Sequence, residues 1–199
     1  MMMNRDQKDH AAWIHTAIEQ LIKNSGRTLR DLDAVAVTEG PGSYTGLRVG
    51  LATAKGFCYA LGIPLITEST LKVMAHAKQV QHPDMAGMLF CPMIDARRME
   101  VFTAIYDDRL EEVMKPAALV LDEQSFADIL SEKKIVFFGS GSEKFKNIAV
   151  SNNASFIEPG YDASHLASLS LRKFQARNFT DPAYAEPAYL KEFYTHTRK

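Results

Sequence analysis

One stretch, residues 39–56, constrains the fold of this chain more than any other. Three glycines and one proline fall within the seven residues from Gly40 to Gly46, and a segment with helical periodicity follows at 47–61. The run before the turn, 34–38, is apolar and β-branched, which is typical of a buried strand. A strand, a glycine turn and a helix in this order bring backbone N–H groups and a helix N-terminus to one point. The stretch is therefore either a phosphate-binding loop or a tightly packed corner.

The spacing of the turn argues against the known phosphate-binding loops. A P-loop requires Gly-Lys-Ser/Thr at its end, but Lys55 follows Ala54. The dinucleotide pattern Gly-x-Gly-x-x-Gly would need a glycine at Thr45. Glu68, at the end of the next expected strand, lies about 20 residues on and keeps a dinucleotide site open as a weak alternative. The packed corner is the favoured interpretation.

The remaining periodicity predicts an α/β chain in two lobes. Helices are expected at 10–23, 47–61, 69–81, 125–130, 143–146 and 165–177, with Asp6 or Asp9 as a cap for the first. Strands are expected at 34–38, 65–67, 88–94, 99–106, 118–121 and 134–138. The lobes are expected at 1–82 and 83–199, and the proline-rich segment 181–190 should lie extended.

Two turns of the expected second lobe carry polar residues. Asp95, Arg97 and Arg98 lie between two apolar strands, where a solvated hairpin is a commoner outcome than a charged functional turn. Residues 139–142, Gly-Ser-Gly-Ser, form a second glycine turn after a strand. Neither turn by itself identifies a chemistry.

Composition and residue spacing argue against a nucleic-acid-binding protein, a metal site and a membrane-spanning protein. The formal net charge of -1 gives no reason to expect a protein whose main task is binding nucleic-acid backbone, although a local basic patch stays open. The two cysteines, Cys58 and Cys91, lie in apolar settings typical of reduced, buried thiols. His10 and His15 are five residues apart and point to different sides of a helix, so no metal site is expected. No apolar run is long enough to span a membrane.

Residues 35–56 closely resemble the signature of the bacterial tRNA threonylcarbamoyladenosine biosynthesis protein family TsaB, also called YeaZ. Residues 94–102 resemble the hairpin of that family, and 186–190 resemble its C-terminal tail. The resemblance implies an actin-like (ribonuclease H-like) two-lobed fold. It also implies a cytoplasmic, non-catalytic scaffold without cofactor, which pairs with the catalytic paralogue TsaD. The ATPase TsaE joins them, and tRNA is met only through the complex.

The resemblance also assigns roles to residues of the first lobe. Pairing in the family uses the first two helices, and a homodimer through the same helices is an alternative. The implied partner-binding residues are Ile14, Ile18, Gly46, Leu47, Gly50, Leu51 and Ala54, although packing within the lobe can explain each of them. The signature turn itself comprises Gly40, Pro41, Gly42, Ser43, Thr45 and Arg48.

One departure from the family concerns the start of the chain. Family members begin with a three-strand hairpin, whereas this chain starts almost directly on its first helix, so the first lobe is expected to lack its first strands. A misassigned start site or a trimmed chain is the hypothesis that follows. Two alternative functions stay open, namely an actin-like ATP-binding enzyme and, with less support, a glycoprotease-like peptidase.

Overall fold

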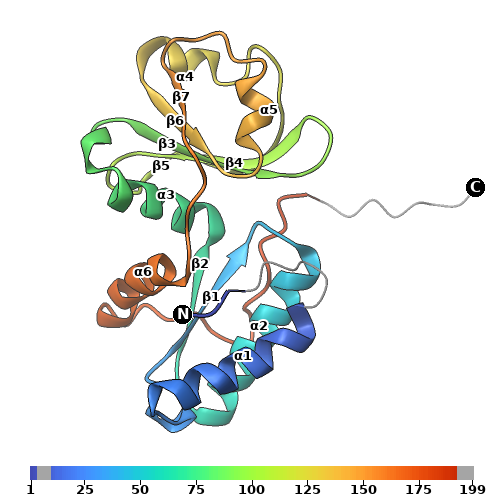
Figure 1. The fold of residues 1–199 in the computed structure, drawn as a ribbon, viewed down its shortest axis with the longest axis vertical. Coiled ribbons are helices and arrows are strands. Elements are labelled where there is room, and N and C mark those ends of the chain that lie inside the picture. Colours follow the sequence, from blue (N-terminus) through green and yellow to red (C-terminus); the bar gives the residue numbers. More distant parts are fainter. Residues whose placement is uncertain (4–9, 192–199) are drawn as a thin grey trace, which may run out of the picture. The chain divides into compact units, whose positions relative to one another are not determined.

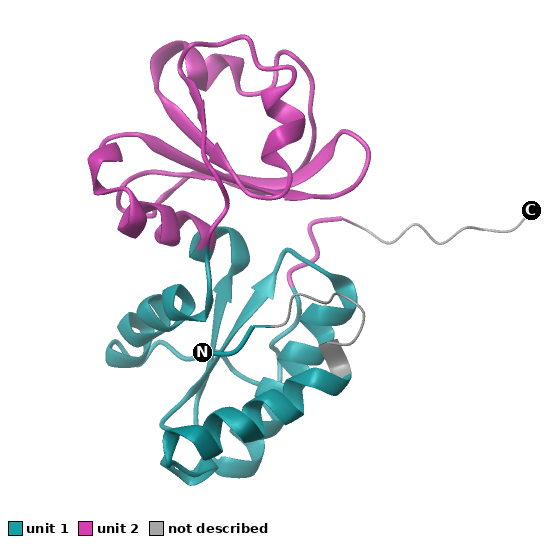
Figure 2. Ribbon diagram, in the orientation of Figure 1, with its two compact units in different colours: residues 1–73, 161–187 teal, residues 74–160, 188–199 magenta. Residues whose placement is uncertain are grey.

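The computed structural model of the chain describes residues 1–3 and 10–191 (Figure 1). Asp6 and Asp9, the expected caps of the first helix, lie outside the described residues. The chain forms two compact units, one of Met1–Val73 with Tyr161–Pro187 and one of Met74–Gly160 with Ala188–Lys199 (Figure 2). The expected lobes, 1–82 and 83–199, differ from this division because the chain returns to the first unit after Gly160.

The first unit is built around a strand–helix–strand motif. Strand β1 (Val35–Gly40) pairs in parallel with β2 (Leu65–Ser69), and α2 (Tyr44–Leu61) connects them. Helix α1 (His10–Ser25), the 3-10 turn η1 (Leu29–Asp31) and α6 (Ala163–Gln175) complete the unit. The predicted strand, glycine turn, helix and strand at the start of the chain are therefore confirmed.

The core of the first unit lies between α2 and the two strands. Leu51, Ala54 and Cys58 of α2 pack with Leu65 and with Ala185 from the C-terminal segment. Residues 176–191 contain no helix, as the prolines of this segment predict, and the Lys55 ammonium donates to the Ala185 carbonyl at 3.1 Å. Residues up to Pro187 are thus part of the first unit.

The second unit contains a five-stranded mixed sheet in the order β5-β4-β3-β6-β7. Its strands are β3 (Leu89–Asp95), β4 (Glu100–Tyr106), β5 (Glu112–Val120), β6 (Ile135–Phe138) and β7 (Ala154–Phe156). Its helical elements are α3 (Thr70–Gln81), which begins in the first unit, η2 (Pro83–Met85), α4 (Ala127–Glu132) and α5 (Ser142–Lys146). The β3–β4 hairpin is antiparallel, as predicted, whereas β6 pairs in parallel with both β3 and β7.

Phenylalanine rings dominate the core of the second unit. Phe137 of β6 packs against Phe126, Phe145 and Phe156 with centroid separations of 5.4, 4.8 and 5.4 Å. Such tilted and offset ring pairs stabilise a core beyond the area that they bury. The cluster joins α5 and β7 to the central strands of the sheet.

Both edges of this sheet differ from the sequence expectation. The expected strand 118–121 is the end of a nine-residue strand, β5, in which exposed and half-buried residues alternate. Pro116 lies inside it, which an edge strand tolerates because one side of its backbone needs no ladder hydrogen bond. At the other edge, β7 has only three residues and was not expected at all. Weak apolar patterning at both edges explains the two differences.

Candidate protein-binding site

The signature turn is a packed corner. Gly40 has a φ of 124°, which favours glycine, and both Gly40 and Pro41 are buried at the end of β1. Ser43 caps α2, its Oγ accepting a hydrogen bond from the Gly46 amide at 3.4 Å. A Cβ placed on Gly42 would lie 3.8 Å from the Leu47 side chain. The turn therefore fixes the direction of α2, and the space beside its backbone is filled by its own side chains.

The polar groups expected of a nucleotide site have structural partners instead. The Arg48 guanidinium lies 4.3 Å from the centre of the Tyr44 ring, one turn earlier on α2. The Glu68 carboxylate, 5% exposed, forms an ion pair of 3.1 Å with Lys173 of α6. Glu68 is therefore bound within the unit and is not placed to accept hydrogen bonds from a ribose.

The stripe of small residues on α2 faces the sheet of its own unit. A Cβ on Gly50 would lie 3.7 Å from Val37 Cγ2 of β1, while a Cβ on Gly46 would meet only the Ser43 cap. Leu51 and Ala54 are each 4% exposed. The sequence assigned Leu51 and Ala54 to partner binding, but they are core residues, because the close approach that the small residues permit is made by β1 and β2.

A second set of small residues on α2 faces outward. Ala52, Gly56 and Ala60 are exposed at four-residue spacing, and a Cβ on Gly56 would meet nothing within 4 Å. Tyr59, beside them, is 92% exposed. We call Ala52, Gly56, Tyr59 and Ala60 the outer α2 face. The same four-residue spacing is present in the series that begins at Gly46, so spacing alone does not identify this outward set.

Helix α1 lines an apolar hollow of about 390 Å³ on the first unit. Ile14, Ile18 and Leu21 lie on one side of α1 and form part of the wall of the hollow. The Leu21 residue is 43% exposed. The other lining residues are Met1, Met2, Trp13, Ala17, Ala163 and Ser164. Ile14 and Ile18, both predicted as partner-binding residues, thus lie where a second molecule can reach them. Leu47 is half-buried beside the turn.

Metal-ligand clusters and the two cysteines were the catalytic features to test in the described ranges. Among these residues, no three histidine, cysteine or acidic side chains are grouped so that they could hold a metal ion. Burial raises the pKa of the Cys91 thiol to about 12, and burial also raises the pKa of Cys58. Both thiols are protonated at neutral pH and are poor nucleophiles. None of the helices described combines the length and apolar character that crossing a bilayer requires.

Comparison with known proteins identifies the family to which the chain is similar. The family described as TsaD, tRNA N6-adenosine threonylcarbamoyltransferase, matches residues 4–192. The tRNA threonylcarbamoyladenosine biosynthesis protein TsaB of Bacillus subtilis is 31% identical over 147 residues, which cover 71% of this chain and 61% of that protein. The Escherichia coli protein of the same description is 25% identical over 198 residues, covering 92% of this chain and 81% of that protein.

A solved structure shares the fold. The crystal structure of an uncharacterized protein with similarity to peptidase YeaZ, from Pseudomonas aeruginosa, has a TM-score of 0.80 at 21% identity. The match covers 92% of this chain and 85% of that chain, and it confirms the expected α/β fold. The chain therefore belongs to the TsaD family, and within that family it groups with the proteins named TsaB and YeaZ.

Proposed function

We propose that this chain is a non-catalytic subunit that supports threonylcarbamoylation of adenosine in tRNA by pairing with a catalytic TsaD-like protein. The relatives named for threonylcarbamoyladenosine biosynthesis support the pathway. The observation that carries the pairing is the accessible apolar surface of the first unit, made of the α1 hollow and the outer α2 face. A TsaE-like ATPase is the further expected component.

The outer α2 face has the chemistry of a helix-docking surface. Small residues at four-residue spacing let a second helix approach closely, and a Cβ on Gly56 would meet nothing within 4 Å. Tyr59 offers a large amphipathic ring, the kind of side chain that often anchors an interface. The α1 hollow adds apolar area through Ile14, Ile18 and Leu21. Binding of a helical partner is therefore the function that this geometry supports best.

The signature turn contributes to partner binding indirectly. Gly40, Pro41 and Gly42 set the direction of α2, and Ser43 caps it. Thr45 is exposed at the first turn of the helix, where a partner can contact it. In this proposal the turn positions the surface and does not bind a phosphate.

Co-purification with the TsaD-like protein of the same organism tests the proposal. Gly56→Leu should keep or raise the stability of this chain, because Leu is a better helix former and nothing lies within 4 Å of the added Cβ. It should nevertheless weaken complex formation by about tenfold or more, because the added side chain blocks close approach of a helix.

The matched control is Ala167→Leu, which places the same leucine side chain at an exposed position of α6. It should bind as the natural chain does. Absence of a complex between the natural chain and the TsaD-like protein at micromolar concentration would contradict the pairing. If Gly56→Leu binds the TsaD-like protein as tightly as the natural chain does, α2 is not part of the interface. If the surface instead pairs two copies of this chain, Gly56→Leu will convert a dimer of the isolated protein to monomer.

A further inference from the structure

The β3–β4 turn holds two arginines in an unusual backbone conformation. Arg97 and Arg98 have φ values of 70° and 48°, consecutive residues in the left-handed region. The Glu100 amide donates to the Arg97 carbonyl at 3.0 Å, and the Ala96 amide donates to the Glu100 carbonyl at 3.1 Å. Three residues, Arg97, Arg98 and Met99, thus lie between the facing residues Ala96 and Glu100. Residues with a Cβ are strained in the left-handed region, which glycine and asparagine tolerate best. A turn that only had to join two strands would be more stable without the arginines.

The rest of the turn is braced by charged and polar groups from α5 and its preceding loop. Asp95 Oδ1 accepts from the Arg97 amide at 2.6 Å and from Lys144 Nζ at 2.8 Å. Lys144 Nζ also donates to the Glu100 carbonyl at 3.0 Å, and the Asp95 amide donates to Ser140 Oγ at 3.1 Å. The strained conformation is therefore held from both ends of the turn.

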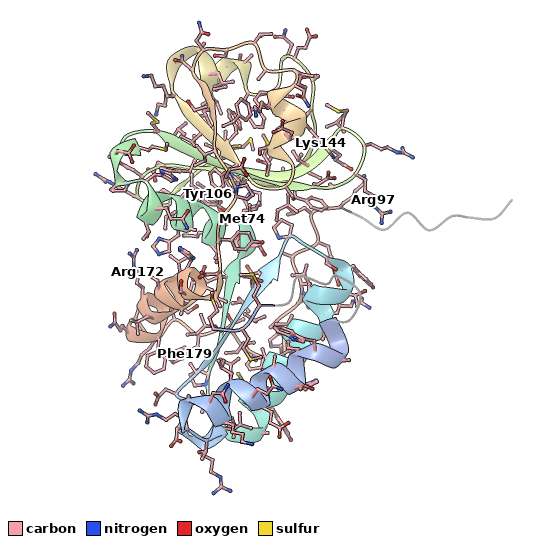
Figure 3. All side chains as sticks on the ribbon, in the orientation of Figure 1. Met74, Arg97, Tyr106, Lys144, Arg172 and Phe179 are labelled. Carbon is pink, nitrogen blue, oxygen red and sulfur yellow. The ribbon has the colours of Figure 1, made fainter. Side chains whose placement is uncertain are left out.

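The charges around the turn leave the two guanidinium groups available. Lys144 is paired with Asp95, and Lys191 is paired with Glu100 at 2.6 Å. Arg97 and Arg98 are exposed, and neither guanidinium has an ion pair or hydrogen-bond partner among residues 1–3 and 10–191. Arg97 lies at the surface of the second unit, where Figure 3 labels it together with Lys144. Strain retained at an exposed position is typical of a functional site.

The chemistry of the pair favours a phosphate ligand. A guanidinium group is planar and presents parallel N–H donors that match two phosphate oxygens. Two adjacent groups on a braced turn suit successive phosphates of a nucleic-acid backbone. Because the net charge of the chain is -1, this contact would be local and would not depend on a basic field over the molecule.

We infer that the Arg97–Arg98 turn contacts the phosphate backbone of tRNA. The inference rests on the proposed function, which brings this chain into a complex that acts on tRNA. The turn supplies affinity and orientation and takes no part in the reaction.

The decisive variant is Arg97→Asn with Arg98→Gly, which removes both cations and places at each position a residue that tolerates a positive φ. It should raise the melting temperature of the chain, since the backbone strain is relieved. In the complex with the TsaD-like protein, it should lower affinity for an unmodified tRNA transcript by about tenfold at 0.1 M salt. The slope of log K against log salt should become shallower by about 1.5 to 2, because two phosphate contacts are lost.

Two controls separate this contact from a general charge effect. Lys133→Gln with Lys134→Gln removes two neighbouring exposed cations of the same unit and should leave tRNA affinity and its salt slope nearly unchanged. Arg97→Lys with Arg98→Lys keeps the charge and should keep most of the salt slope. Unchanged affinity and slope in the Asn-Gly variant would overturn the inference.

The same titrations distinguish failure of the inference from failure of the proposed function. Complex formation is measured first for each variant. If the Asn-Gly variant loses the TsaD-like protein while the lysine control does not, the turn binds an acidic protein surface and the tRNA contact is wrong. If the natural chain forms no complex, the proposed function fails. The tRNA titration of the chain alone then decides whether the arginines contact RNA, and equal binding by natural chain and Asn-Gly variant excludes it.

Discussion

Individual glycines in the two strand–turn–helix segments differ in the space that their surroundings leave for a side chain. A Cβ on Gly139, whose φ is 105°, would overlap the Met93 carbonyl oxygen and lie 2.7 Å from Met74 Cε. A Cβ on Gly141 would lie 2.7 Å from Val101 Cγ1. A Cβ on Gly50 would lie 3.7 Å from Val37, which is ordinary contact. The second glycine turn is therefore required by close backbone packing, whereas Gly50 has room for a methyl group.

Alanine at these two positions should act in opposite directions. Gly50→Ala should raise the free energy of unfolding by about 0.5–1 kcal/mol, because alanine is the better helix former and adds a methyl contact. Gly139→Ala should lower it by about 2–4 kcal/mol, because a positive φ and a clash with backbone are combined. Urea unfolding of the two variants measures both changes. A destabilised Gly50→Ala would show that α2 packs more tightly on β1 than this structure describes.

The thiol of Cys91 should be inert in the folded chain. Burial raises its pKa to about 12, although the Thr103 hydroxyl lies 3.2 Å from Sγ and lowers the pKa slightly. A thiol reagent at pH 8 should therefore modify Cys91 only after urea is added.

The same burial makes stability depend on pH. Because the unfolded thiol loses its proton near pH 9 and the folded thiol does not, the unfolded state binds fewer protons above that pH. Stability should fall from about pH 9 upward relative to a Cys91→Ala variant. Rapid labelling of native Cys91 would contradict its burial.

At the level of elements, a partly buried ion pair joins α6 to β2. Lys173 Nζ lies 3.1 Å from Glu68 Oε1 and donates to the Thr67 carbonyl at 2.7 Å. The Glu68 side chain is 5% exposed, so removing its partner leaves a buried charge. This contact is one of several, with the Thr180–Leu65 and Lys55–Ala185 hydrogen bonds, that hold residues after Gly160 in the first unit.

Lys173→Met should therefore lower the free energy of unfolding by about 1–3 kcal/mol, because the nearly buried Glu68 side chain loses its ion-pair partner, while the 34% exposure of Lys173 keeps the loss below that of a fully buried pair. Adding Glu68→Leu should recover much of this loss, because neither charge is then buried. Thermal unfolding of the two single variants and the double variant measures the coupling. Additive effects would show that the pair does not interact.

The elements that the sequence predicts well are those with strong periodicity. Residues 44–61 and 70–81 form helices close to the expected bounds, and the Asp95–Arg98 turn joins two strands as predicted. Strand β7 was missed because three residues carry no periodic signal. The return of residues 161–187 to the first unit was not predicted, because contacts such as Glu68–Lys173 join residues 105 positions apart, which local patterns do not reveal.

The candidate site was predictable only in part. Ile14 and Ile18 could be assigned to a surface because their spacing defines one side of α1. Leu51 and Ala54 could not be distinguished from surface residues by spacing, since the stripe beginning at Gly46 and the outer series at Ala52, Gly56 and Ala60 share the same four-residue period. Only the position of β1 against Gly50 decides which series faces inward.

At the level of the whole molecule, two features converge on a supporting role. The first unit presents an apolar hollow and an outward helix face, and the chain belongs to a family that modifies adenosine in tRNA. The signature turn is closed on its own side chains, with Glu68 engaged by Lys173. These features support the proposal that this chain enables a TsaD-like catalyst without performing the reaction.

Reconstitution of the modification reaction tests this claim most directly. The TsaD-like and TsaE-like proteins of the same organism are combined with tRNA, ATP and the activated threonylcarbamoyl donor, with and without this chain, and threonylcarbamoyladenosine is measured in the tRNA. We expect product only when this chain is present with the TsaD-like protein, and less product when Gly56→Leu replaces the natural chain at limiting concentration. Product formed equally well without the chain, or by the chain in the absence of the TsaD-like protein, would contradict the proposed supporting role.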